Sequence, residues 1–207
     1  IMPFALILIL LLSTVSVSFG QNKNLSREEV EKMIEKVATK RGIPSIILKS
    51  IAKIESGFCQ FTTNGNPLTS KGGNIGIMQV SNKGNEYNME KLKYNPLYNI
   101  EAGADVLIKK WQIANAKMAL IGNMDPNILE HWYFALWAYN GLLDRNNPNV
   151  NSRTYQSKVY EVASKEYNQK ITTVSRGSIP SRGYPKNNVR IPTPEEYHVG
   201  DIIKYAP

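Results

Sequence analysis

Glu55 is the residue of this chain best placed to do chemistry, because it ends an apolar run, residues 46–57, that has helical spacing. In a helix, Ile47, Ile51 and Glu55 lie on one line, so the carboxyl group extends a hydrophobic stripe. Such a stripe faces a core, where partial loss of water raises the pKa of a carboxyl group. A proton donor that stays protonated near neutral pH is what general-acid catalysis requires. The alternative is a solvated glutamate in the last turn of a helix, and the pattern alone does not separate the two.

Two glycine-containing stretches are the next candidates for a binding site. Residues 70–79 read Ser-Lys-Gly-Gly-Asn-Ile-Gly-Ile-Met-Gln, and residues 138–141 read Ala-Tyr-Asn-Gly. The glycines at 72, 73 and 76 allow backbone amides to approach a ligand closely, which suits sugar binding. Turn formation is the alternative explanation, and by themselves the glycines favour it.

The other reactive side chains form no recognisable site. No activating motif surrounds His131 or His198, so a thiol hydrolase built on Cys59 is disfavoured, and we expect Cys59 to be a small buried residue. These residues also lack the spacing of metal ligands, so we expect no metal and no cofactor. His131 shares a helical line with Tyr139, but a capped or surface histidine is the favoured interpretation. We assign five aromatic residues to the core: Trp111, Trp132, Tyr133, Trp137 and Tyr155.

The helices that must position these residues are marked by their ends. Ser26 and Glu29 form a capping box, which predicts a helix that stops at Gly42. Pro44 opens the next helix, which carries Glu55 near its end.

The rest of the chain up to residue 170 also predicts mostly helix. Helices are expected at 96–119, 127–139 and 152–168, and the second of these has so little polar face that it should be the buried centre of a bundle. Residues 57–74 predict a long loop, with a short hairpin as an alternative, and residues 75–80 predict a brief strand. We therefore expect one mainly helical domain over residues 21–170.

Hydropathy and charge set the two ends of the chain apart. Residues 1–20 carry no charge, and 4–17 are almost continuously apolar, which is typical of a secretory signal cleaved after Gly20. If it is retained, the segment would be a membrane anchor. Residues 171–207 are rich in Pro, Lys and Arg without helical period, so they predict a basic tail or an extended wrap.

The overall composition predicts an exported protein in anionic surroundings. The single cysteine excludes an intramolecular disulfide, which in an exported protein is more typical of bacteria. The net charge of +8 predicts contact with cell-wall polymers or a membrane surface, through the basic tail, and export makes nucleic acid the weakest candidate. An inert, solvated tail is the alternative, and we expect a monomer.

Four stretches, in this order, resemble the soluble lytic transglycosylases of the goose-lysozyme-related type. They are residues 55–58, 75–79, 99–103 and 138–141, which read Glu-Ser-Gly-Phe, Ile-Gly-Ile-Met-Gln, Asn-Ile-Glu-Ala-Gly and Ala-Tyr-Asn-Gly. The resemblance covers about residues 40–165 and implies a lysozyme-like α+β fold, in which a helical bundle and a small β/loop segment surround a substrate cleft. The chain departs from the family pattern in three places: Ile77 replaces Leu, no Pro follows Gln79 closely, and Gly141 directly follows Asn140.

The resemblance also implies a reaction and a role for each matching residue. The reaction is cleavage of the bond between N-acetylmuramic acid and N-acetylglucosamine in peptidoglycan, with closure of a 1,6-anhydro ring and without water. Glu55 is implied as the sole catalytic acid and base. Residues around it are implied to bind or support substrate: Ser56 as a helper of the acid or substrate, Gly76, Met78 and Gln79 as a cleft wall, Tyr139 beside the acid, and Asn140 as a cleft-side support.

The sequence agrees with a single carboxylate. Glycosidases with two carboxylates hold them about 5 to 9.5 Å apart, but Glu86 and Glu90, the next acids after Glu55, lie in no recognisable motif. Three alternatives remain: a muramidase that uses water at the same site, a wall-binding module with little turnover, and a basic nucleic-acid binder. The intact Glu55, Gln79 and Tyr139 argue against the pure binding module.

Overall fold

The computed structural model describes residues 22–194. The predicted signal segment, 1–20, and residues 195–207 of the predicted tail lie outside this range. The described chain forms six α-helices: α1 (Arg27–Arg41), α2 (Ser45–Ser56), α3 (Met89–Tyr94), α4 (Pro96–Lys117), α5 (Tyr133–Tyr139) and α6 (Tyr155–Tyr167). Three 3-10 helices and two short strands complete it: η1 (Leu129–Trp132), η2 (Asp144–Asn146), η3 (Arg176–Ser178), β1 (Leu120–Ile121) and β2 (Arg190–Ile191). None of the described helices combines the length and the apolar character needed to cross a bilayer.

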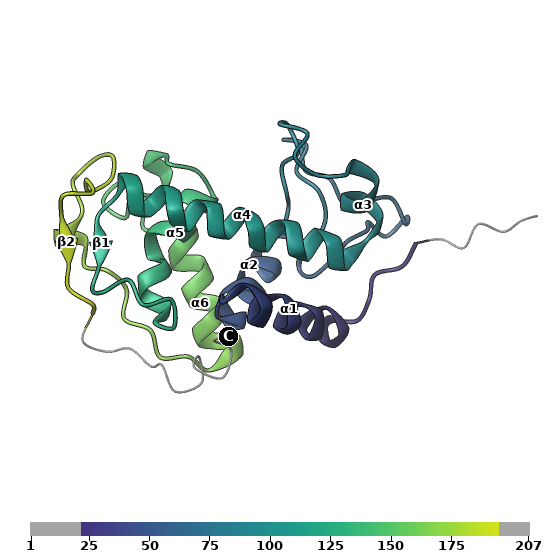
Figure 1. Ribbon diagram of the computed structural model, residues 1–207, viewed down its shortest axis with the longest axis horizontal. Coiled ribbons are helices and arrows are strands. Elements are labelled where there is room, and N and C mark those ends of the chain that lie inside the picture. The colour runs from purple at the N-terminus through teal and green to yellow at the C-terminus, as the bar shows by residue number, and fades with distance from the viewer. Residues whose placement is uncertain (1–21, 195–207) are drawn as a thin grey trace, which may run out of the picture.

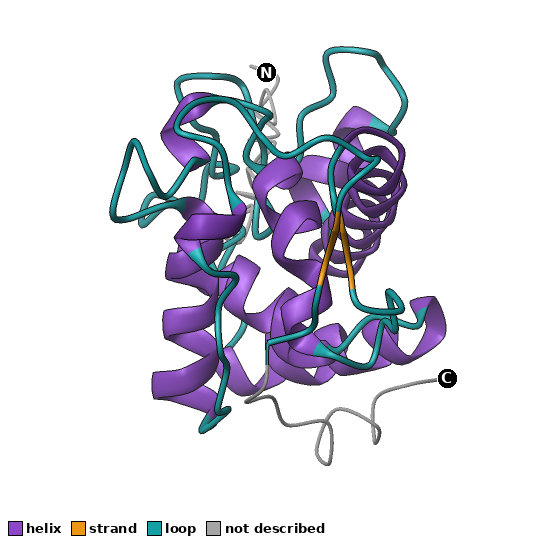
Figure 2. Cartoon of the chain, turned by 90° about the vertical axis from the view of Figure 1, so that its left-hand side faces the viewer, coloured by secondary structure: helices purple, strands orange, loops and turns teal. Residues whose placement is uncertain are grey.

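The helices pack around α4, which runs across the molecule (Figure 1). α4 contacts α1 on one side and α5 on the other, and α2 contacts α6. A lobe of loops that carries α3 lies at one end of the molecule, and the two strands lie at the other (Figure 1). The two strands pair in parallel, with Ile121 opposite Ile191 (Figure 2). The prediction of a mainly helical fold with a small β/loop segment is confirmed.

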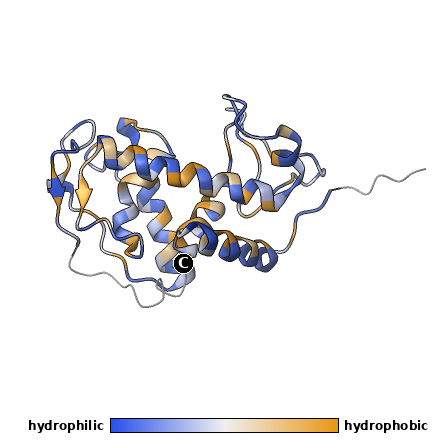
Figure 3. Cartoon of the chain, in the orientation of Figure 1, coloured by the Kyte–Doolittle hydropathy of each residue, from blue (hydrophilic) through white to orange (hydrophobic). Residues whose placement is uncertain are grey.

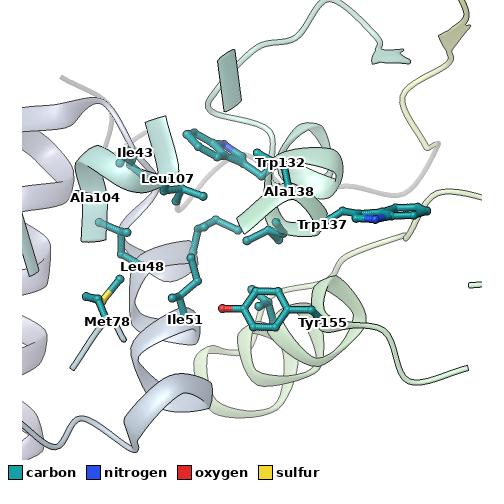
Figure 4. Close-up of a cluster of buried hydrophobic side chains, with 14 of the residues drawn as sticks. Ile43, Leu48, Ile51, Met78, Ala104, Leu107, Trp132, Trp137, Ala138 and Tyr155 are labelled. Carbon is teal, nitrogen blue, oxygen red and sulfur yellow. The ribbon is translucent and has the colours of Figure 1, made fainter. Parts of the chain in front are cut away.

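The core lies where α2, α4 and α5 meet. Hydrophobic and hydrophilic residues alternate along the helices (Figure 3). Helix α5 is buried along almost its whole length, as its sequence predicts. The core draws on α2, α4, α5 and the loop before α3, with Leu48, Ile51, Met78, Leu107 and Trp137 among its members (Figure 4). Trp132, Trp137 and Tyr133 are buried as predicted, whereas Trp111 is half-buried against the Trp132 ring at 4.2 Å between centroids.

Helix ends follow the predicted caps. Ser26 and Glu29 form the capping box of α1, and Gly42 ends that helix in the left-handed conformation with φ of +65°. Pro44 precedes α2, and Gly57 ends it with φ of +62°. These two caps place Glu55 in the last turn of α2.

Two predicted elements differ from the structure, and one helix was not predicted. Residues 75–80 form a tight turn in place of a strand: the Ile75 and Val80 backbones exchange hydrogen bonds of 3.0 Å. A strand is excluded because Gly76 and Gln79 have φ of +72° and +47°. The single helix predicted over 127–139 begins later, as η1, because Ile128 is extended. Helix α3 was not predicted, since six residues show no helical period.

Two predictions about single residues are also wrong. Cys59 is half-buried, because it lies in the turn that follows Gly57 at the edge of the core. His131 is buried and not a surface residue: its Nδ1 pairs with the Asp125 carbonyl at 2.9 Å and its Nε2 with the Thr193 hydroxyl at 2.7 Å.

Residues 171–194, here called the strap, run as an extended segment along the helical body (Figure 1). The backbone amides of Ala119, Leu120 and Gly122 donate to strap carbonyls. The side-chain amide of Asn147 donates to the carbonyls of Pro180 and Gly183 at 2.9 and 2.8 Å. Four strap residues are buried: Val174, Ile179, Pro185 and Ile191. Of the two predicted forms, the extended wrap describes this segment.

Candidate active site

Glu55 is half-buried at the carboxyl end of α2. Ile47 and Ile51, on the same helical line, are fully buried, so the predicted stripe ends in the carboxyl group as the spacing indicated. Burial raises the pKa of Glu55, and a hydrogen bond from Tyr155 partly offsets this rise in pKa. The prediction of a raised pKa agrees with this environment. A group of this kind can carry a proton into a reaction and receive one afterwards.

Tyr155 is the functional residue that the sequence did not reveal. Its hydroxyl donates to Oε1 of Glu55 at 2.6 Å, although the two residues are 100 positions apart. Tyr155 is buried, as predicted, and its ring projects from the start of α6 with the hydroxyl directed toward α2 (Figure 4). A buried tyrosine hydroxyl requires a partner, but this rule does not identify which one.

Tyr139 stands beside the same acid. Its ring stacks on the ring of Tyr155, with centroids 6.2 Å apart and planes inclined by 14°. Its hydroxyl donates to the backbone carbonyl of Met78 at 2.9 Å. Burial and the charge of Glu55 raise the pKa of both tyrosines well above 10, so both phenols remain neutral donors.

The 75–80 turn is held by two buried amide side chains. Asn99 accepts from the Met78 amide at 2.9 Å and donates to the Ile75 carbonyl at 2.9 Å. Gln60 accepts from the Ile77 amide at 3.3 Å, and it donates to the carbonyls of Leu92 and Lys93 at 2.7 and 2.8 Å. A Cβ on Gly76 would come within 2.4 Å of Asn99 and 2.6 Å of Gln60, which explains why only glycine fits here.

The 75–80 turn places backbone groups, more than side chains, at the site. The Met78 side chain is fully buried against Gly103, where an added Cβ would lie 2.4 Å from it. The contribution of Met78 to the site is therefore its carbonyl, which accepts from Tyr139. Gln79 is half-buried, and its side-chain amide donates to the Gly76 carbonyl at 2.9 Å.

Ser56 and Asn140 bond to protein groups and not to Glu55. The Ser56 hydroxyl donates to the Ile77 carbonyl at 2.8 Å, so it joins α2 to the turn. Asn140 accepts from Arg145 at 3.2 Å and from Asn146 at 3.3 Å. Asn146 in turn accepts from the Tyr155 amide at 3.3 Å, so Asn140 belongs to the frame that positions Tyr155.

A hollow of about 380 Å³ opens beside Tyr139 and Gln79. Its other walls come from residues 80–87 and from α4 between 106 and 113. A second hollow, of about 440 Å³, lies among strap residues and includes none of the site residues named above.

Glu55 is a solitary carboxylate in this setting. Burial raises its pKa and the Tyr155 hydrogen bond lowers it, with no contribution from a second ionised side chain among residues 22–194. Glu86 lines the hollow but pairs with Lys109 at 2.5 Å. The described residues also contain no group of three or more His, Cys, Asp or Glu placed to hold a metal ion.

The described residues form a mainly helical, lysozyme-like body in which the half-buried acid Glu55 bonds to Tyr155, and Tyr139, stacked on Tyr155, lines a hollow. The chain matches the model of the Transglycosylase SLT domain over residues 32–162, and it belongs to that family. No curated protein and no solved structure matches it. The matched range contains Glu55, the 75–80 turn, Tyr139 and Tyr155.

Proposed function

We propose that this chain is a peptidoglycan lytic transglycosylase with Glu55 as its only catalytic acid and base. The observation that carries the proposal is the environment of the half-buried Glu55 carboxyl. Burial raises its pKa, and its Oε1 accepts a hydrogen bond of 2.6 Å from Tyr155. The bond cleaved is the β-1,4 bond between N-acetylmuramic acid and N-acetylglucosamine. The family match supports the substrate class, and the solitary acid supports the single-carboxylate chemistry.

The reaction balances without water. Protonated Glu55 gives its proton to the glycosidic oxygen, and the bond from C1 of the muramic acid residue to that oxygen breaks. The N-acetyl group of the same sugar shields the positive charge at C1, as in substrate-assisted glycosidases. Glu55, now ionised, takes the proton of the 6-hydroxyl, and this oxygen bonds to C1 to close the 1,6-anhydro ring.

The neighbours of Glu55 support both halves of this cycle. The Tyr155 hydroxyl donates to the carboxylate that the first step creates, and a charge-assisted bond of this kind is stronger than a neutral one. Tyr139 and Gln79 line the hollow and are proposed to contact the sugar. Four residues are proposed to act indirectly, through the backbone and side-chain bonds that fix the 75–80 turn and Tyr155: Ser56, Gly76, Met78 and Asn140.

A zymogram on purified peptidoglycan tests the role of Glu55. Glu55→Gln removes the proton donor at nearly constant size, so the rate of clearing should fall by at least about 100-fold. Glu90→Gln is the matched control, because Glu90 is an exposed acid on α3. Equal clearing by the Glu55→Gln variant and the unaltered chain would remove Glu55 from the mechanism and favour a wall-binding role.

Export and attachment to the wall are part of the proposal. The apolar run at 4–17 supports a secreted or periplasmic protein that begins at Gln21 after cleavage, and membrane anchoring if cleavage does not occur. The net charge of +8 supports contact with anionic wall polymers or membranes. We propose that the protein acts as a monomer. N-terminal sequencing of the protein recovered from cell envelopes should begin at Gln21, and a retained apolar segment would contradict cleavage.

A further inference from the structure

The hollow beside Tyr139 carries more positive charge than its sugar-binding role requires. Lys83, Lys109 and Lys110 line it, together with a single acid, Glu86. The wall thus has three cations and one anion. A glycan of neutral sugars carries no negative charge that could pair with this excess of positive charge.

The three lysines differ in whether they form ion pairs. Lys109 is already engaged, because its Nζ lies 2.5 Å from Glu86 and 5.8 Å from the centre of the Tyr87 ring. Lys83 is exposed and Lys110 is half-buried, and neither forms an ion pair with any residue between 22 and 194. The uncompensated charge of the hollow therefore belongs to Lys83 and Lys110.

The two lysines line the hollow from different elements. Lys83 follows the 75–80 turn, whereas Lys110 projects from α4. Tyr139 and Gln79 line the same hollow, so a strand that lies against these two residues brings its side branches toward the lysines. The sugar rings of a peptidoglycan strand are neutral, and its carboxylates are carried on the lactyl branch of muramic acid.

We propose that Lys83 and Lys110 bind a carboxylate on the lactyl branch of muramic acid and so select strands by the charge of that branch. The inference rests on the proposed function, because it specifies the substrate of the same cleft. The carboxylate has two sources: the lactyl group itself where no peptide is attached, or the peptide that extends from it. Both present the same chemistry to the lysines.

The test measures binding by the full chain carrying Glu55→Gln, so that ligands are not consumed. Three ligands are compared: a neutral β-1,4 oligomer of N-acetylglucosamine, glycan oligomers stripped of peptide, and the same oligomers with peptide. The test variant is Lys83→Gln/Lys110→Gln, and Lys83→Arg/Lys110→Arg retains the charge. Lys117→Gln is the control, an exposed lysine at the end of α4 outside the hollow.

Each exposed ion pair changes affinity by about twofold to fivefold, so the double glutamine variant should bind charged ligands about tenfold more weakly. The loss should shrink at high salt, and the arginine and Lys117 variants should retain affinity. Affinity for the neutral oligomer should not change. A loss for peptide-bearing strands alone assigns the carboxylate to the peptide, a loss for stripped strands alone assigns it to the lactyl group, and a loss for both shows that the lysines accept a carboxylate from either source.

Three results would overturn the inference. If the double glutamine variant binds all three ligands unchanged, the lysines do not recognise the branch, although the cleft still binds glycan and the proposed function stands. If it loses the neutral oligomer equally, the substitutions deform the hollow. If the chain with both lysines intact binds none of the three ligands, this inference and the proposed function both fail.

Discussion

At the residue scale, burial and the Tyr155 hydroxyl act on the pKa of Glu55 in opposite directions. Burial disfavours the carboxylate and raises the pKa, whereas the hydrogen bond of 2.6 Å favours the carboxylate and lowers it. The acid must be protonated to begin the reaction and ionised to finish it. The balance between these two effects therefore sets the upper pH limit of activity.

Tyr155→Phe should raise the pKa of Glu55, because it removes the group that stabilises the ionised form while burial remains. We expect the alkaline limb of the pH–activity profile to move to higher pH. The maximal rate should fall by about tenfold, since a hydrogen bond to a charged group is lost. Tyr94→Phe, an exposed tyrosine on α3, is the control. An unmoved alkaline limb in the Tyr155→Phe variant would show that the bond does not tune the acid.

The pairing of Glu55 with Tyr155 also marks the limit of what the sequence predicts about the site. The caps and the stripe of α2 were sufficient to place Glu55 in the last turn of the helix, but they left a buried carboxyl with a raised pKa and a solvated one as alternatives. Tyr155 occupies a core position of α6, and its contact with Glu55 depends on how α2 and α6 pack, which no local pattern encodes. For the same reason, the Ser56 hydroxyl was expected near the acid or substrate but bonds to the Ile77 carbonyl.

At the scale of elements, the 75–80 turn depends on the absence of a side chain at residue 76. The strand predicted there from apolar residues is prevented by two left-handed backbone conformations, at Gly76 and Gln79. The Asn99 and Gln60 amides fill the space where a Cβ would lie. The turn in turn presents the Met78 carbonyl to Tyr139.

Gly76→Ala should lower the free energy of unfolding by about 3 kcal/mol, from backbone strain and from overlap with Asn99 and Gln60. Clearing of peptidoglycan should fall as well, because the turn must move. Gly73→Ala is the matched control: Gly73 also has a positive φ, +83°, but an added Cβ would have no atom within 4 Å. It should cost about 1 kcal/mol. Equal urea midpoints for the two variants would contradict the packing argument.

The contact between η1 and the strap contains an ionisable group. Glu130 is buried; its Oε1 accepts from the Thr172 amide at 3.0 Å, while its Oε2 has no hydrogen-bond partner among the described residues. Burial raises its pKa from 4.5 to about 7. The folded chain therefore binds a proton more tightly than the unfolded chain, and stability from this group is full below the unfolded pKa and falls as pH rises toward 7.

Glu130→Gln should remove this pH dependence, because the amide keeps an acceptor for Thr172 without a charge. In the unaltered chain, Glu130 should account for a loss of up to about 3 kcal/mol between pH 4.5 and 7.5. Thermal unfolding of both proteins at these two pH values measures the difference. If the variant shows the same drop in Tm as the unaltered chain, Glu130 is not responsible.

At the scale of the whole molecule, the strap packs residues 171–194 against the helical body. Proline-rich and basic residues without helical period predicted either a tail or a wrap, and composition could not decide between them. Contacts between residues far apart in sequence show that the segment is a wrap: Asn147 bonds to Pro180 and Gly183, and β1 pairs with β2. The helical core, in contrast, followed from local caps and spacing.

A chain that ends at Lys170 should be less stable than one that ends at Pro194 by at least about 3 kcal/mol. Each of the buried side chains Val174, Ile179 and Ile191 contributes about 1.5 to 3 kcal/mol before chain entropy is subtracted. Urea unfolding of both chains provides the comparison. Equal midpoints would mean that the strap is an inert appendage, as the alternative interpretation of the sequence held.

The most direct test of the whole account is mass spectrometry of the muropeptides that the unaltered chain releases from purified peptidoglycan. The account predicts products that end in 1,6-anhydro-N-acetylmuramic acid, each lighter by one water than its hydrolysed counterpart. Products with a reducing muramic acid end would contradict it, since a water molecule would then have replaced the 6-hydroxyl at C1 and the protein would be a muramidase.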